Sequence, residues 1–254
     1  MIDAHAHLDD PKLAPDLDGV IDRAREAGIE RILSCGQDLS SSRETLDIAR
    51  RWPIVRVAVG VHPHRAETWS DEVARGLREL ARDERVVAIG EIGIDLSGRS
   101  APRDAQERAM RAQLVLAREL ALPAVVHVRD AGNAARAIVD EVPGVTGMIH
   151  CYSEGPDEVE AWLGRGFVIS FAGPVTYPKN EALRGAAARV PRTSLLAETD
   201  APYLAPQARR GTRNEPSYVL ETMATLAAAQ GVAPAALGEA ITANARRIFG
   251  GRWA

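Results

Sequence analysis

The chain has 254 residues, of which 46% are hydrophobic and 26% charged, with a formal net charge of -4 at pH 7. This balance is ordinary for a globular protein and excludes disordered and fibrous classes, and the negative charge argues against a protein that coats nucleic acid by bulk electrostatics. No stretch resembles a membrane span or an export signal, so a cytoplasmic protein without a membrane partner is expected.

Eight apolar, strand-like runs follow one another along the chain. They cover residues 2–8, 31–36, 55–62, 86–94, 123–129, 146–152, 167–173 and 194–200. Segments between them have apolar residues near i, i+3, i+4 and i+7 and often end on Gly, as helices do. The count and order predict a (β/α)8 TIM barrel that forms a single domain over residues 1–254, with an extra C-terminal helix beyond Gly231.

A doubly wound open sheet is the structural alternative, because alternation of strands and helices does not distinguish it from a barrel. The number of strands favours the barrel. The GxGxxG turn of a dinucleotide-binding fold is also absent after the first strand, which weakens the alternative further.

The first strand carries two histidines, His5 and His7, in the sequence IDAHAHL. On an extended strand, residues i and i+2 point to the same face, so two imidazoles are directed at one point. Neutral imidazole suits zinc and neighbouring metals, although the same pair also occurs as ordinary polar surface.

Histidines and carboxylates recur at the carboxyl ends of the later strands, where the loops of a barrel build its active site. They are His62 and His64 on the third strand, Glu91 and Asp95 on the fourth, His127 on the fifth, His150 on the sixth and Asp200 on the eighth. None of the six histidines falls in a predicted helix. Stray surface histidines therefore explain the pattern poorly.

Glu91 lies inside the apolar run VVAIGEIGI, where a carboxylate is costly to bury without a positive partner. A metal ion is the natural partner, and an arginine across the barrel is the alternative. Four imidazoles and two carboxylates can fill two metal shells if one carboxylate bridges. Two cations roughly 3.5–4 Å apart can activate water and stabilise charge on a phosphoryl oxygen.

Cys35 and Cys151 are the two cysteines of the chain. Two are too few for a disulfide framework. Both are expected to be reduced, small apolar residues in or beside strands, with a thiolate ligand or nucleophile as the alternative.

A series of motifs runs along the chain in a fixed order. It comprises DAHAHLD at 3–9, GVHPH at 60–64, GEIGID at 90–95, LPAVVHVRDA at 122–131, HCYS at 150–153, ETDAPYLAP at 198–206 and RNEPSYV at 213–219. With this series the chain resembles, over essentially its whole length, the TatD-type metal-dependent deoxyribonucleases of the amidohydrolase-like barrel superfamily.

The resemblance implies two divalent metal ions. His5, His7, Glu91 and Asp200 would surround one ion, and Glu91, His127 and His150 the other, so that Glu91 bridges. The ions can be zinc, manganese or magnesium, although magnesium prefers oxygen ligands. A metal-activated water would cleave a phosphodiester and Asp200 would take its proton, with a purely structural role for Asp200 as the alternative.

The resemblance also suggests substrate contacts. His62 and His64 would line the cleft and contact phosphate, although His64 can instead satisfy a loop backbone. Arg129 and Arg213 can bind phosphate oxygens, since an arginine fork matches them. Tyr203 can stack on a base or simply pack in the cleft wall.

The activity that the resemblance implies is 3′-5′ exonuclease action on single-stranded DNA. The alternative keeps the metals and changes the ester, for example to that of a D-aminoacyl-tRNA; a non-catalytic nucleic-acid binder fits the ligand set less well. Where the family continues after GEIGID with tyrosines, this chain has Leu96, Ser97, Gly98 and Arg99, which is expected to reduce base stacking. A monomer without an obligate protein partner is expected.

Overall fold

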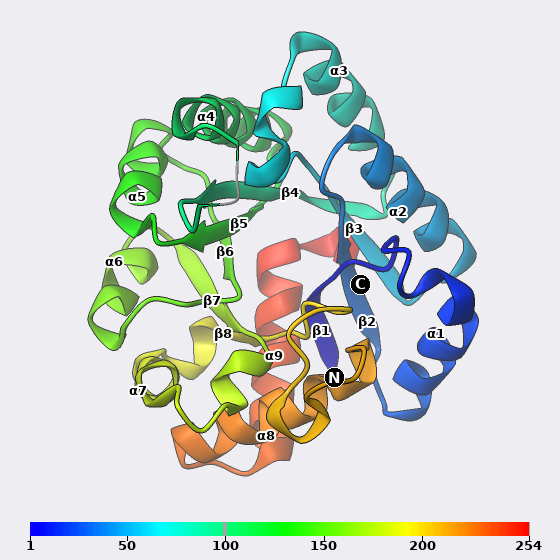
Figure 1. The fold of residues 1–254 in the computed structure, drawn as a ribbon, viewed down its shortest axis with the longest axis vertical. Helices are drawn as coiled ribbons and strands as arrows, with labels where there is room; N and C mark the ends of the chain where they lie inside the picture. Colours follow the sequence, from blue (N-terminus) through cyan, green and yellow to red (C-terminus); the bar gives the residue numbers. More distant parts are fainter. Residues whose placement is uncertain (99–100, 254) are drawn as a thin grey trace.

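Eight parallel strands form one sheet whose strands are ordered β1 to β8 as in the sequence, and helices surround it (Figure 1). The computed structural model describes residues 1–98 and 101–253. The strands are β1 (Ile2–Ala6), β2 (Arg31–Cys35), β3 (Val55–Val59), β4 (Val86–Asp95), β5 (Ala124–Arg129), β6 (Gly147–His150), β7 (Phe167–Phe171) and β8 (Leu195–Ala197). The predicted (β/α)8 barrel is confirmed, and the doubly wound alternative is wrong.

The helices that follow the strands cover the outside of the barrel (Figure 1). They are α1 (Leu17–Glu26), α2 (Leu39–Arg51), α3 (Asp71–Leu80), α4 (Arg103–Leu120), α5 (Gly132–Glu141), α6 (Val159–Leu163), α7 (Glu181–Arg189) and α8 (Val219–Gln230). Their inward faces bury Leu, Ile, Val and Ala against the strands, as their periodicity predicts. No helix in the described part of the chain is long and apolar enough to cross a membrane.

The barrel closes between β1 and the segment that follows β8. The amide of Asp200 donates to the carbonyl of His5 at 2.9 Å, and the amide of His7 donates to the carbonyl of Ala201 at 2.7 Å. Asp3 in β1 accepts hydrogen bonds from the backbone amide and hydroxyl of Thr199 at 2.9 and 2.5 Å. These bonds place His5, His7 and Asp200 beside one another, although they come from opposite ends of the chain.

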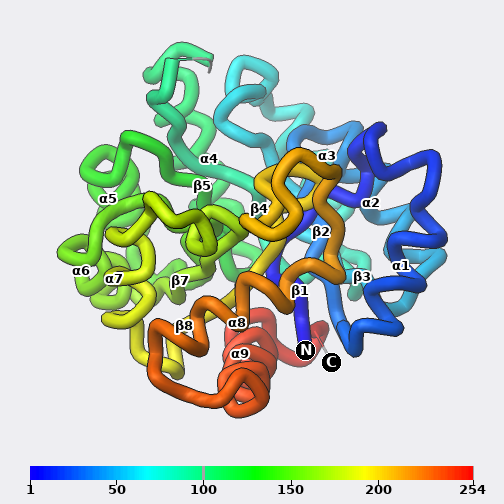
Figure 2. The backbone as a smooth tube through the Cα atoms, turned by 60° about the horizontal axis from the view of Figure 1, so that its bottom comes forward, coloured from blue at the N-terminus to red at the C-terminus, as the bar shows by residue number. Residues whose placement is uncertain are grey.

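The predicted extra helix is α9 (Pro234–Phe249), which packs on β1, β6 and β8. In Figures 1 and 2 it lies close to the beginning of β1. Its buried residues Leu237, Ile241 and Phe249 recur at helical spacing and extend the barrel core. The amino-terminal end of the barrel is thereby partly covered.

Several strands are shorter than predicted at their carboxyl ends. The predicted first strand ends at residue 8, whereas β1 ends at Ala6, and residues 60–62, 151–152, 172–173 and 198–200 lie beyond their strands. His7, His62 and Asp200 therefore lie on the first residues of the βα loops. His64 lies in a 3₁₀-helix, η2 (Pro63–Thr68), and not at a strand end, because the Pro63 turn starts a helix there.

An ion pair between α1 and the segment before η7 (Pro216–Tyr218) gives a pH-dependent prediction. Arg23 donates to both carboxylate oxygens of Glu215, which is 5% exposed, at 2.8 and 2.9 Å. Burial would raise the pKa of Glu215, but hydrogen bonds from Arg23 and Ser217 lower it below its usual value. The pair therefore stabilises the fold above the unfolded pKa of about 4.3, and this contribution is lost as the pH falls through the lowered pKa.

Replacing Glu215 by Gln is expected to reduce the free energy of unfolding by about 1–2 kcal/mol at pH 7, between the values for exposed and buried pairs. Urea unfolding at pH 7 and pH 3 measures the free energy of unfolding of the variant and of the unsubstituted protein. The difference between the two free energies should be smaller at pH 3. An equal difference at both pH values would contradict the ionic contribution.

Candidate metal centre

The side chain of Glu91 lies at the centre of a buried cluster of histidines at the carboxyl end of the barrel. Its two carboxylate oxygens face two different groups of side chains. Oε2 lies 3.3 Å from His5 Nε2 and 3.4 Å from His7 Nε2. Oε1 lies 3.0 Å from His127 Nδ1 and 2.8 Å from His150 Nε2. One carboxylate thus connects two sets of potential ligands.

The first set is completed by Asp200. Its Oδ1 lies 3.7 Å from His5 Nε2 and 3.4 Å from His7 Nε2, and these two nitrogens are 3.2 Å apart. Ligand atoms bound tetrahedrally at 2.0–2.2 Å from one ion are separated by about 3.3–3.6 Å. The spacing of the donor atoms therefore fits a single divalent ion.

Unsatisfied hydrogen-bonding capacity also points to a cation. Glu91 is 1% exposed, and no described residue donates a hydrogen bond to its Oε2. A buried carboxylate oxygen without a donor is costly unless a cation meets it. The arginine alternative finds no support, because the charged groups paired with Glu91 among the described residues are all histidines.

Hydrogen bonds to the second nitrogen of each ring decide which nitrogen is free to bind a metal. His7 Nδ1 lies 2.9 Å from the carbonyl of Cys35, and His150 Nδ1 lies 3.1 Å from Glu198 Oε1. His127 Nε2 lies 3.3 Å from Asp95 Oδ2. Each acceptor holds the proton on that nitrogen, so the opposite nitrogen presents its lone pair to the Glu91 side.

His62 shows the reverse arrangement. Its Nδ1 accepts the backbone amide of His64 at 3.1 Å, and its Nε2 faces Glu91 Oε1 at 3.2 Å. Burial lowers the pKa of His62 to about 4 against the opposing charge of Glu91, so the ring is neutral at pH 7. Nε2 then carries the only ring proton and donates it. Although close enough to be a ligand, His62 is arranged as a hydrogen-bond donor.

Charges inside the cluster oppose the effect of burial. Burial alone would raise the pKa of Glu91, but the surrounding imidazoles, that of His150 most strongly, hold it well below its usual range. Burial would lower the pKa of His7, but Asp200 and Glu91 raise it to about 9. Binding of a cation to His7 is therefore expected to release a proton.

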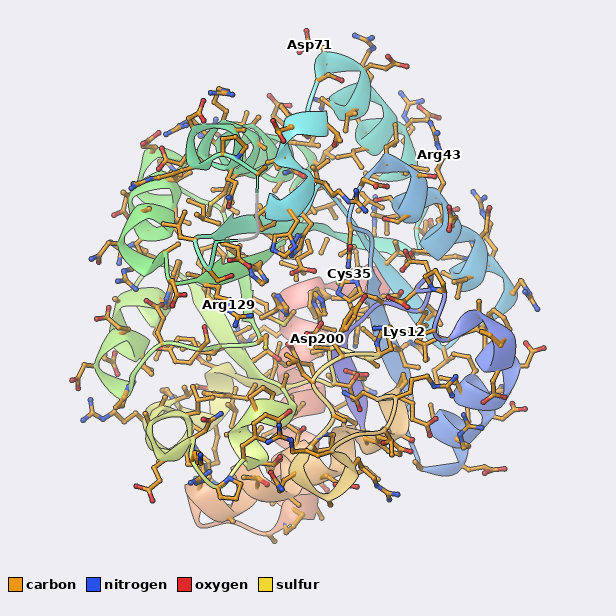
Figure 3. All side chains as sticks on the ribbon, in the orientation of Figure 1. Lys12, Cys35, Arg43, Asp71, Arg129 and Asp200 are labelled. Atoms are coloured by element: carbon orange, nitrogen blue, oxygen red, sulfur yellow. The ribbon has the colours of Figure 1, made fainter. Side chains whose placement is uncertain are left out.

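A cavity of about 790 Å³ opens over the cluster. Arg129 at the end of β5, Tyr203, His62 and His64 line it, as does Lys179. Figure 3 shows Arg129 and Asp200 inside the ring of helices, whereas Arg43 and Asp71 lie at its periphery. The cavity thus combines the acidic and imidazole cluster with positive charge at its rim.

Tyr203 and Arg213 have different surroundings. Tyr203 is 38% exposed, and its hydroxyl donates to the carboxylate of Asp10. Arg213 is not among the residues that line this cavity: its guanidinium donates to the carbonyl of Lys12 at 3.1 Å and pairs with Asp16 at 3.3 Å. The structure therefore does not bring Arg213 together with the metal cluster.

The loop after Asp95, in which Leu96 and Ser97 replace the tyrosines of the family, hydrogen-bonds the Asp95 carboxylate. The amide and hydroxyl of Ser97 donate to Asp95 Oδ1 at 2.8 and 2.6 Å, while Asp95 Oδ2 faces His64 and His127. Burial would raise the pKa of Asp95, but the bonds from His127 and Ser97 hold it well below its usual range. Arg99 lies outside the described residues.

Both cysteines are free thiols near the cluster, as predicted. Cys35 Sγ lies 3.4 Å from His5 Nδ1. Burial and the charge of Glu91 raise the pKa of the Cys35 thiol, so it is protonated at pH 7. A thiolate role for Cys35 is not supported.

Glu198 is the acidic residue of the site that sequence reasoning missed. It is fully buried, and its Oε1 accepts from the amide of Cys151 at 2.7 Å as well as facing His150. The signal was available: Glu198 is a second carboxylate in an apolar strand end, as Glu91 is, but the nearby Asp200 was the more obvious ligand.

We expect Glu198→Ala to weaken metal binding by about 10–100-fold, because His150 loses the acceptor that sets its tautomer. Glu198→Gln, which keeps one acceptor oxygen, should lose less. Metal titration of stripped protein measures the affinity, with the exposed Glu72→Ala as the control. Unchanged affinity in folded Glu198→Ala would contradict this role.

Comparison with known proteins adds independent findings. A family model described as TatD related DNase matches residues 2–250. The uncharacterized metal-dependent hydrolase YabD of Bacillus subtilis is 34% identical over 251 residues, covering 98% of each chain. The 3'-5' ssDNA/RNA exonuclease TatD of Erwinia billingiae is 37% identical over 257 residues, again covering 98% of each.

A solved structure, that of the TatD homolog YJJV of Escherichia coli, superposes with a TM-score of 0.92 at 28% identity, covering 98% of this chain and 97% of that one. The similarity in sequence and in structure therefore extends over nearly the whole chain. The protein belongs to the TatD related DNase family of metal-dependent hydrolases.

Proposed function

We propose that this protein is a metal-dependent exonuclease that hydrolyses phosphodiesters from the 3′ end of single-stranded DNA, with RNA as a second substrate. The observation that carries the proposal is the position of Glu91, whose two oxygens face two sets of potential ligands. A bridging carboxylate of this kind suits two cations acting on one phosphoryl group. The name of the Erwinia billingiae relative supports the polarity and the substrate.

The residues divide into two ligand sets. His5, His7 and Asp200 would hold one divalent ion and His127 and His150 the other, with Glu91 between them. Bound cations would supply Lewis-acid polarisation of the phosphoryl group and acidify the attacking water. Their number and identity, among zinc, manganese and magnesium, belong to the proposal.

Asp200 is the proposed proton acceptor. Burial would raise the pKa of Asp200, but the hydrogen bond from His7 and the charges of His7 and His5 lower it. The carboxylate is therefore ionised at neutral pH. It also lines the cavity, so it can take a proton from a nucleophile located there.

His62 would orient the bridging carboxylate and not the substrate, because its Nε2 donates towards Glu91 Oε1 and its Nδ1 accepts from the amide of His64. Other residues of the cavity would bind the substrate. Arg129 and Lys179 are exposed cations at the rim, suited to successive phosphates of one strand. Tyr203 presents a ring on which a base can stack, held by its bond to Asp10.

Single-stranded DNA labelled at either end tests the proposal. Metal-stripped protein should release nucleotides only when Mn²⁺ or Mg²⁺ is added, and a 3′ label should be released before a 5′ label. Asp200→Asn should slow release by about 100-fold or more, as expected for loss of a general base. Metal-independent release, or 5′ label leaving first, would overturn the proposed activity.

Hydrolysis of a D-aminoacyl-tRNA ester is the second candidate, because it would use the same ligands. Incubation with that substrate in parallel separates the two. Deacylation with intact DNA would transfer the function to ester hydrolysis and leave the metal centre in place. A cytoplasmic location, a monomeric state and reduced base stacking in the loop after Asp95 stay predictions.

A further inference from the structure

A second large cavity, of about 930 Å³, lies at the opposite end of the barrel from Glu91. Its walls come from the segments that precede β2, β3 and β4 and from the residues that follow α9. Figure 2 shows the beginning of β1 close to α9 on this side. The mechanism proposed above uses none of these residues.

Positive charge is concentrated in this cavity, although the chain as a whole is acidic. Five arginines line it: Arg25, Arg31, Arg56, Arg85 and Arg252. Burial and then the charges of Arg31 and Arg85 lower the pKa of Arg56, which is a sign that the guanidinium groups crowd one another. Clustered positive charge of this kind attracts anions.

Two of these arginines bind backbone carbonyls and leave their charge uncompensated. Arg31 donates to the carbonyls of Trp253 at 3.1 Å and Glu30 at 2.9 Å. Arg252 donates to the carbonyls of Ala81 and Val86, both at 3.0 Å. These bonds orient the side chains without neutralising them. Within residues 1–98 and 101–253, no carboxylate forms an ion pair with either arginine.

Among the described residues, the two acidic side chains that line the cavity, Glu30 and Glu84, form no ion pair with Arg31 or Arg252. Glu30 forms ion pairs with two groups that do not line the cavity, the terminal amine of Met1 at 3.4 Å and Arg246 at 3.7 Å. Glu84 is exposed and forms no ion pair with a described residue. Asp83, which does not line the cavity, pairs with Arg85 at 3.1 Å.

We propose that this cavity binds a multiply charged phosphate anion, either a free oligophosphate or the phosphates of a single-stranded nucleic acid. Guanidinium groups held by carbonyls are preoriented, and their planar forks match phosphate oxygens. The buried side chains of Ile29 and Ile54 form an apolar part of the wall. The inference does not depend on catalysis at the metal centre.

Calorimetric titration with inorganic tripolyphosphate at an ionic strength of about 50 mM, where screening is weak, tests the site. Binding should persist in Glu91→Ala, which removes the bridging carboxylate of the metal centre. It should weaken by about tenfold or more in the double variant Arg31→Gln, Arg252→Gln. Arg43→Gln is the matched control, since Arg43 is exposed on the outside of α2, and should bind as the unsubstituted protein does.

A variant that is expected to increase the affinity provides a second test, because misfolding cannot produce tighter binding. Glu84→Gln removes an exposed negative charge from the cavity wall and should tighten tripolyphosphate binding by about two- to fivefold. The site is overturned if tripolyphosphate does not bind, if binding disappears in Glu91→Ala, or if neither the arginine variant nor Glu84→Gln changes the affinity.

A single-stranded oligonucleotide, titrated in the Glu91→Ala background, distinguishes the two sources of phosphate. If the arginine variant weakens oligonucleotide binding as much as tripolyphosphate binding, the cavity binds nucleic acid phosphates. If only tripolyphosphate binding changes, the ligand is a small phosphate anion. Both results support the phosphate site.

Discussion

Replacing Glu91 by alanine is expected to abolish turnover, lowering kcat/KM for single-stranded DNA by about 1,000-fold or more. The carboxylate faces both ligand sets, so its loss affects both proposed cations at once. Removal of metal stabilisation worth several kcal/mol gives a rate loss of this size. Metal content after dialysis measures the loss of bound cations, and the rate of nucleotide release measures the loss of turnover.

Two control variants separate the bridging role from general damage. Glu91→Gln keeps the shape but removes the charge, and should be nearly as inactive as alanine. Glu119→Ala, at an exposed helix position paired with Arg78 at 2.7 Å, should keep full activity. Substantial activity or full metal content in folded Glu91→Ala would contradict the proposed bridging role of this carboxylate.

Replacing Gly93 by alanine is expected to lower the free energy of unfolding by about 3 kcal/mol or more. Gly93 has φ +140°, a conformation that L side chains rarely adopt, and a Cβ there would clash with the carbonyl oxygen of His127 at 1.9 Å. Strands β4 and β5 pair directly at this point. Separating them would also displace Glu91 and His127, so metal affinity should fall with stability.

Two other glycines separate backbone strain from lack of space. Gly98 has φ +96°, but no described atom lies within 4 Å of the position that a Cβ would take, so Gly98→Ala should cost only about 1 kcal/mol. Gly155 has neither a positive φ nor a close described neighbour, and Gly155→Ala should be nearly neutral. Urea unfolding ranks the three variants. Equal effects at Gly93 and Gly98 would refute the steric argument.

Local patterns predict much of this fold because the periodicity of apolar residues is a property of the chain itself. The eight strands and the helix α9 follow from that periodicity, and the barrel follows from their order. Strand ends are less predictable. Apolar residues such as Leu8, Val61 and Tyr152 still follow the strand ends Ala6, Val59 and His150, so hydrophobicity alone does not mark the last paired residue.

The chemistry of the metal cluster is similarly visible in the sequence. Histidine and carboxylate at strand ends of a parallel barrel must converge at one face, so His5, Glu91 and Asp200 can be grouped without coordinates. Arg213 shows the limit of this reasoning. Its loop follows the eighth strand, yet its side chain turns to Lys12 and Asp16, which only the folded arrangement of two distant loops determines.

Residue type and spacing along the chain are enough to predict the barrel, its order of strands and most of the candidate metal ligands. The role of each imidazole ring, in contrast, depends on contacts that form only when the chain folds. Glu198 holds the proton on His150 Nδ1, whereas the amide of His64 occupies His62 Nδ1. A tautomer depends on which groups meet in space, and Glu198 reaches His150 from a different strand end, 48 residues further along the chain.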